Sequence, residues 1–174
     1  MPEVFKDGAF IETAYARVDD DAPLTGDGVA LVSVSRWKQD AAKLLESAQR
    51  VGVFVEPADV DDDDLSSLTQ APVIAINFPK FTDGRGYSVA RTLRDRLNFQ
   101  GELLATGDVL IDQIPLMLRC GFGSYSVSHE PTVTALRSNA FKGIQHIYQS
   151  PSSGLRWQRR SRSKDGGKSG VSAS

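Results

Sequence analysis

The chain has 174 residues, of which 40% are hydrophobic and 24% are charged, and its formal net charge is −2. This composition is typical of one globular domain and excludes two catalytic domains. Its single cysteine, Cys120, excludes a disulfide framework, a multi-cysteine zinc site and an iron–sulfur cluster held by this chain alone. With only two histidines, we expect no histidine-rich metal site. Because there is no apolar run of about 18 residues, we expect a cytoplasmic protein without a membrane segment.

Charge is unevenly distributed along the chain. Residues 151–174 carry six Lys or Arg and one Asp, a balance of +5, which leaves −7 for residues 1–150. We predict a hairpin and loop over residues 1–28, an α/β domain over residues 29–149 and a disordered basic tail over residues 150–174. The tail could contact nucleic acid or an acidic partner, or only solubilise the protein. The acidic body argues against nucleic acid as the main ligand.

The predicted elements begin with a β-hairpin, because Asp7-Gly8 stands between two apolar runs. A loop rich in Gly, Asp and Pro follows over residues 19–28. Apolar runs then predict five strands, over residues 29–34, 51–55, 72–78, 102–106 and 122–127. Helical spacing predicts helices over residues 37–48, 89–97, 109–118 and 132–141, with a short closing strand near residues 144–148.

Strands that alternate with helices predict a single α/β domain with a mostly parallel sheet of five or six strands, connected by helical crossovers. Periodicity does not distinguish an open doubly wound sheet from a partial barrel. In both architectures, ligands bind beyond the carboxyl ends of the strands. The loops that follow the strands are therefore the first places to look for a site.

The loop after the third strand, residues 79–88, combines glycines with positive charge. Gly84 and Gly86 are expected to adopt left-handed backbone angles, and Ser88 is expected to cap a helix that begins near Val89. With free amides, this loop would suit a phosphate, sulfate or carboxylate group. The candidate ligand-binding residues here are Lys80, Asp83, Gly84, Arg85, Gly86, Tyr87, Ser88 and Arg91. The alternative is an ordinary Asp-Gly turn whose cations pair with Asp83 or Asp108.

The segment after the fourth strand supplies two carboxylates. Asp108 and Asp112 are four residues apart on the predicted helix and would share a face, with Gln113 as a further ligand-binding candidate. Near Arg85, they could perform acid–base chemistry or hold a cation. The alternative is structural, with Asp108 as the helix N-cap and Asp112 in a first-turn salt bridge. Pro115 is expected to kink this helix, and Cys120 is expected to be a buried, inert thiol.

Several of these segments resemble a known family. They are Asn77–Ser88 (NFPKFTDGRGYS), Gly107–Leu110 (GDVL) and Arg119–Phe122 (RCGF). Over about residues 29–149, the chain resembles the bacterial domain of unknown function 934. Its members are labelled as oxidoreductases of sulfite reduction and are often encoded beside assimilatory sulfite reductase. The resemblance implies a role in sulfate assimilation and cysteine biosynthesis, with that reductase as a partner.

The absence of cofactor motifs in the sequence limits which part of sulfite reduction this chain can perform. Enzymes that reduce sulfite use siroheme and an iron–sulfur cluster, and this sequence has no cluster, haem or dinucleotide motif. We therefore predict an accessory protein that binds a small anionic metabolite or the reductase. The alternative is an independent enzyme that uses Asp83, Asp108 and Asp112 for acid–base or metal-assisted chemistry on a phosphorylated molecule. A third hypothesis is a scaffold anchored by its tail. The main expectation is that Lys80, Arg85, Asp108 and Asp112 meet at one mouth of the fold.

Overall fold

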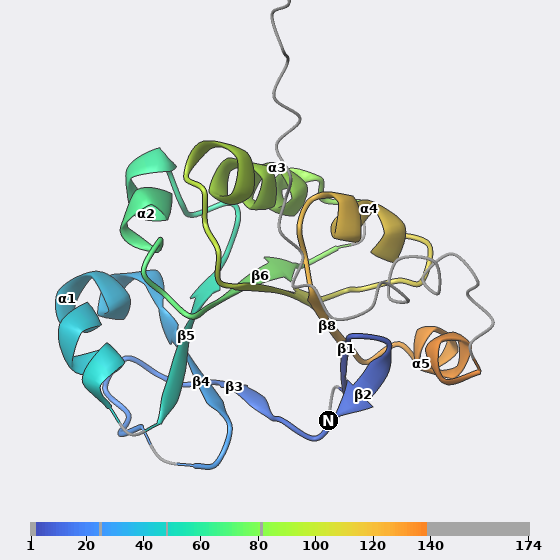
Figure 1. The fold of residues 1–174 in the computed structure, drawn as a ribbon, viewed down its shortest axis with the longest axis horizontal. Helices are drawn as coiled ribbons and strands as arrows, with labels where there is room; N and C mark the ends of the chain where they lie inside the picture. Colours follow the sequence, from blue (N-terminus) through green and yellow to red (C-terminus); the bar gives the residue numbers. More distant parts are fainter. Residues whose placement is uncertain (1–2, 25, 48, 81, 139–174) are drawn as a thin grey trace, which may run out of the picture.

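The computed structural model describes residues 3–24, 26–47, 49–80 and 82–138 (Figure 1). The predicted basic tail, the predicted closing strand and the end of the helix predicted over residues 132–141 lie outside the described residues. Within them, the strands are β1 (Glu3–Lys6), β2 (Ala9–Ile11), β3 (Tyr15–Arg17), β4 (Val29–Ser33), β5 (Arg50–Val55), β6 (Val73–Phe78), β7 (Glu102–Gly107) and β8 (Ser124–Val127). The helices are α1 (Val34–Glu46), α2 (Asp62–Ser67), α3 (Arg85–Arg91), the π-helix η1 (Thr92–Arg96), α4 (Ile114–Arg119) and α5 (Glu130–Arg137).

All of these strands belong to one sheet, in the order β2-β1-β8-β7-β6-β5-β4-β3. Strands β3 to β8 are parallel neighbours in chain order, whereas β1 pairs antiparallel with both β8 and β2. The mostly parallel α/β domain is thus confirmed, but the prediction of five or six strands is wrong. The hairpin joins the main sheet by pairing with the edge of β8, and β3 is too short to show an alternating pattern.

The sheet curls into a half-barrel (Figure 1). A flat sheet of eight strands would separate β2 from β3 by about 34 Å. Only residues 12–14 connect these two outer strands, and such a link reaches at most about 14 Å. The two ends of the sheet must therefore approach each other. This decides between the two predicted architectures in favour of the partial barrel.

The two faces of the curled sheet have separate cores. The larger core lies between the convex face and the helices, and it includes Trp37, which is 1% exposed and donates its indole N–H to the Ser67 carbonyl at 3.1 Å. The smaller core lies on the concave face and consists of Val4, Val29, Leu31, Val73, Ala75 and Leu104. Because side chains alternate along a strand, the residues of β6 and β7 that point into the concave face can be assigned from these two sets.

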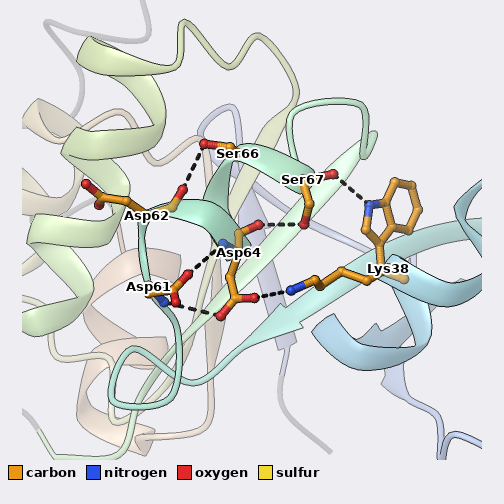
Figure 2. Close-up of polar contacts among 7 residues, drawn as sticks. Lys38, Asp61, Asp62, Asp64, Ser66 and Ser67 are labelled. Atoms are coloured by element: carbon orange, nitrogen blue, oxygen red, sulfur yellow. Dashed lines mark hydrogen bonds and ion pairs between the residues drawn. The ribbon is translucent and has the colours of Figure 1, made fainter.

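The acidic run after β5 begins a helix that the hydrophobic pattern does not show. Asp61 caps α2 by accepting from the Asp64 backbone N–H at 2.8 Å, and the Asp64 side chain accepts from the Asp61 N–H (Figure 2). Carboxylates in a first helical turn interact favourably with the helix dipole. Lys38 of α1 adds an ion pair to Asp64 at 2.6 Å. With six residues and one buried side chain, Leu65, α2 is too short for a recognisable period.

Candidate functional site

The loops that follow β6 and β7 meet at the C-terminal edge of the sheet. The Asp108 backbone N–H donates to the Phe78 carbonyl at 2.7 Å, which joins the first residue after β7 to the last residue of β6. Gly107 has a φ of +90°, and a Cβ atom there would lie 2.4 Å from the Phe78 carbonyl oxygen. Only glycine fits this backbone without strain. The two candidate loops are therefore neighbours, as the parallel arrangement predicts.

Within the β6 loop, the predicted roles of the two glycines are wrong. Gly84 has a φ of −78° at the start of α3, and Gly86 lies inside that helix, where it is buried. A Cβ atom on Gly86 would lie 2.6 Å from two ring atoms of Phe78. Glycine is needed at position 86 for close packing between α3 and β6, and not for a left-handed turn.

Ser88 is not the N-cap that the sequence predicts. Helix α3 begins at Arg85, so Ser88 lies inside it and is exposed, and no side chain caps this helix. The neighbouring Tyr87 packs its ring against Phe78, with ring centroids 5.1 Å apart. The prediction fails because the apolar period begins at Val89, whereas the helix starts one turn earlier.

Arg85 forms a bidentate ion pair with Asp83. Its Nε and Nη2 atoms donate to the carboxylate at 3.0 and 2.7 Å. These bonds, with a backbone bond from Arg85, lower the pKa of Asp83 to about 2. The bond to Asp83 also raises the pKa of Arg85, and the charge of Asp59, in the loop after β5, adds to this shift. The alternative interpretation, in which a cation of this loop pairs with Asp83, is therefore confirmed for Arg85.

The other two cations of this region are exposed. Lys80 follows β6 in the turn before α3, and it takes part in no ion pair among the described residues. Arg91 ends α3 near Cys120. Burial raises the pKa of the Cys120 thiol, and the charge of Arg91 opposes that rise. Cys120 is 5% exposed, which confirms the expected buried thiol.

Asp108 and Asp112 do not share a helix. Helix α4 begins at Ile114, so both carboxylates precede it, and the prediction that one helix face carries them is wrong. Pro115 lies in the first turn of α4, where it displaces no helical hydrogen bond, so the predicted kink is absent from α4. Gln113 holds the turn before α4 by accepting from the Leu110 backbone N–H at 3.3 Å.

We expected Lys80, Arg85, Asp108 and Asp112 to form one site. They lie on two neighbouring loops, but the predicted contact of Arg85 with Asp108 and Asp112 is not formed. Arg85 bonds Asp83 rather than Asp108 or Asp112. Asp112 instead lies near Tyr87, whose pKa is raised by burial and, to a smaller extent, by the charges of Cys120 and Asp112. Among the described residues, no three His, Cys, Asp or Glu side chains gather closely enough to hold a metal ion. No helix in this part of the chain has the length and apolar character needed to cross a membrane.

Comparison with known proteins places this region in a family. A family model described as a bacterial protein of unknown function, DUF934, matches residues 52–156. The chain belongs to this family. Searches of curated proteins and of solved structures each found no match. The DUF934 segment runs from β5 through α5 and includes every candidate site residue discussed above.

The DUF934 segment also contains polar residues that sequence reasoning missed. Glu56, Asn77, Thr106 and Ser126 stand at or just beyond the C-terminal ends of β5, β6, β7 and β8. Asn77 Nδ2 donates to both oxygens of the Glu56 carboxylate, at 3.0 and 2.9 Å. Each of these residues follows, by two positions, a residue on the concave face. This two-residue spacing is the sequence signal that could have placed them on the concave face. It shows that they lie side by side only once the register between the strands is known.

Proposed function

We propose that this chain is an accessory protein of assimilatory sulfite reduction that binds a small anionic metabolite at the loop after β6. The observation that carries the proposal is the exposure of Lys80 and Arg85, which follow the end of β6 at the C-terminal edge of a parallel sheet. This edge is where ligands bind in such folds. The context of sulfite reduction is taken from the labels of the proteins that the sequence resembles, whereas the matched family model is described only as a bacterial protein of unknown function.

In this role, the protein does not carry the electrons itself. An iron–sulfur cluster is held by several cysteine thiolates, and this chain has one cysteine, which is buried. The reduction is therefore assigned to the reductase. The accessory protein would bind its substrate, its product or the reductase surface.

Asp83 is the internal competitor for such an anion. It occupies Nε and Nη2 of Arg85, which leaves Nη1 for an incoming oxyanion. The Arg85 side chain is 60% exposed, so the ion pair is accessible to a ligand. An anion that binds here must share or replace the Asp83 carboxylate. Removal of the negative charge at position 83 should therefore strengthen anion binding.

The test is calorimetric titration of the purified protein with sulfite, sulfate and the purified reductase. We expect Lys80→Ala and Arg85→Ala each to raise the Kd of the bound anion about tenfold or more, because a charge-assisted hydrogen bond contributes about 1.5–3 kcal/mol. Asp83→Asn should lower it several-fold. Arg50→Gln is the matched control, because Arg50 is an exposed cation at the opposite end of the sheet. No binding to any of the three, or an equal loss in Arg50→Gln, would overturn the proposal.

The alternative, an independent enzyme with Asp83, Asp108 and Asp112 as acid–base groups or metal ligands, has less geometric support. Asp83 is engaged by Arg85, and Asp112 stands in the turn before α4 near Tyr87. Turnover of a phosphorylated small molecule with Mg²⁺, abolished by Asp108→Asn or Asp112→Asn, would favour the enzyme over the accessory protein.

A further inference from the structure

We propose a second binding site on the concave face, at the row formed by Glu56, Asn77, Thr106 and Ser126, that takes the protonated amino group of a small molecule. This site lies outside the cationic β6 loop, and the inference does not rest on the proposed function.

The pairing of the strands places the four side chains in one row. Asn77 is paired directly with Thr106. Glu56 comes next to Asn77, because the β5–β6 register ends at Val55 and Ile76, one residue earlier on each strand. In the same way, Ser126 follows the last registered pair of β7 and β8, Ala105 with Tyr125.

The row faces the concave side of the sheet. Ala75 and Leu104 belong to the concave core, and Asn77 and Thr106 follow them by two residues on the same strands. The intervening Ile76 and Ala105 belong to the core on the helix side. Glu56, Asn77 and Thr106 are partly buried, and Ser126 is 9% exposed. A ligand on this row would therefore rest on an apolar floor formed by the concave core.

The Glu56 carboxylate is held in a fixed orientation. Asn77 Nδ2 lies 3.0 Å from one of its oxygens and 2.9 Å from the other. The backbone of Gly107 lies close to this side chain, since a Cβ atom at position 107 would lie 2.5 Å from Asn77 Oδ1. This arrangement supports the carboxylate from one side and leaves an acceptor position on each oxygen.

The negative charge of Glu56 has no cationic partner among the described residues. None of the ion pairs within the described ranges includes it. Arg17, which lies on the same face, stacks on the Phe54 ring at 4.5 Å instead. A partly buried carboxylate whose single partner is a neutral amide is costly to desolvate further unless a cation accompanies it. The site therefore favours a positively charged ligand group over an anion.

The acceptors of the row match an ammonium group. An ammonium has three donors and no acceptor. The two Glu56 oxygens and the hydroxyl oxygen of Thr106, two strands away, supply acceptors, and this hydroxyl forms no hydrogen bond within the part of the chain that the structure describes. A divalent cation would need more carboxylates than this row contains. A primary amine with a short carbon chain satisfies both the charge and the apolar floor.

The experiment uses three probes of similar size: ethanolamine, ethylene glycol and acetate. Backbone amide shifts of the full chain are followed by NMR during each titration. We expect saturable shifts at residues of this row with ethanolamine alone. Glu56→Gln should raise its Kd at least tenfold, and Thr106→Val about threefold, whereas Glu46→Gln, an exposed carboxylate on α1, should leave it unchanged.

Three outcomes would overturn the inference: no saturation with ethanolamine, equal saturation with ethylene glycol or acetate, or an equal effect of Glu46→Gln. Thr106→Val keeps the test valid if Glu56→Gln fails to fold. Lys80→Ala and Arg85→Ala should not change the Kd for ethanolamine. Failure of this site can thus be separated from failure of the anion-binding proposal.

Discussion

The two ends of the concave face each hold a partly buried glutamate, in opposite circumstances. At the N-terminal end of β7, Glu102 accepts from Lys6 at 2.6 Å, from Tyr15 at 2.8 Å and from Ser124 at 2.6 Å. At the C-terminal end of β5, the Glu56 carboxylate accepts from Asn77 alone among the described residues. One carboxylate is neutralised and fully bonded, and the other is oriented but retains its charge.

The difference relates to the distinct roles of the two ends of the strands. Tyr15 lies on β3 and Glu102 on β7, four strands away, which a flat sheet would separate by about 19 Å. Their hydrogen bond therefore crosses the concave face and fastens the curl. In β/α folds, the N-terminal ends of the strands serve stability, and the C-terminal ends carry sites. The bonded Glu102 and the site that we propose at Glu56 fit this division.

The largest expected loss of stability follows from removal of the Glu102 carboxylate. Glu102→Ala leaves Lys6, Tyr15 and Ser124 without their shared acceptor, and we expect the free energy of unfolding to fall by about 3 kcal/mol. Glu56→Ala should lower it by less than about 1 kcal/mol, because Glu56 has one neutral partner and water can reach both. Urea denaturation of the two variants measures this contrast. Equal losses would mean that the two ends do not differ in their contribution to stability.

A smaller loss of stability is expected when Gly107, whose backbone lies next to Asn77 at the Glu56 end of the concave face, is replaced. Gly107→Ala places a Cβ atom 2.4 Å from the Phe78 carbonyl oxygen in a residue with a φ of +90°. We expect the free energy of unfolding to fall by about 2 kcal/mol, together with weaker ethanolamine binding through displacement of Asn77. Gly123→Ala is the control, because a Cβ atom there meets nothing within 4 Å. Thermal unfolding and the ethanolamine titration report both effects. Unchanged binding in Gly107→Ala would argue against the support of Asn77 by Gly107.

The smallest expected effect is the pH dependence of the stability that Glu102 contributes. Burial raises the pKa of Glu102, but the hydrogen bonds from Lys6, Ser124 and Tyr15 outweigh it and leave the pKa below its ordinary value. A carboxyl with a lowered folded pKa stabilises the protein above its unfolded pKa of about 4.3, and this stabilisation is lost as the pH falls through the folded pKa. The stability gap between the wild type and Glu102→Gln should therefore narrow as the pH falls from about 6 to 3. Denaturant titrations at several pH values test this, and a constant gap would contradict the shift.

Local signals predicted local structure well. Asp7-Gly8 forms the expected hairpin turn, with φ values of +51° and +85°, because this dipeptide tolerates the positive angles that the turn requires. Apolar runs placed five of the parallel strands, because a strand buried on both faces must be largely apolar. Helix starts were less predictable. Ser88 and Asp108 have residue types that cap helices, but packing against β6 and the turn before α4 set the actual boundaries.

The candidate site was predicted only to the level of its loops. Lys80 and Arg85 do stand at the C-terminal edge of the sheet, as the rule for parallel strands requires. The partner of Arg85 could not be chosen among Asp83, Asp108 and Asp112, because all three are within reach in sequence or in space. Glu56 and Asn77 are 21 residues apart, and no sequence period connects them.

By itself, the sequence determined the class of fold, the hairpin, the parallel strands and the edge of the sheet that carries the candidate loops, because these follow from alternation, turn chemistry and chain connectivity. Only the tertiary structure decided the curl of the sheet, the close contact of Gly86 with Phe78 and the contrast between Glu102 and Glu56. Those features depend on which side chains face each other across neighbouring and opposite strands, and strand register is fixed by packing of the whole core rather than by any local segment.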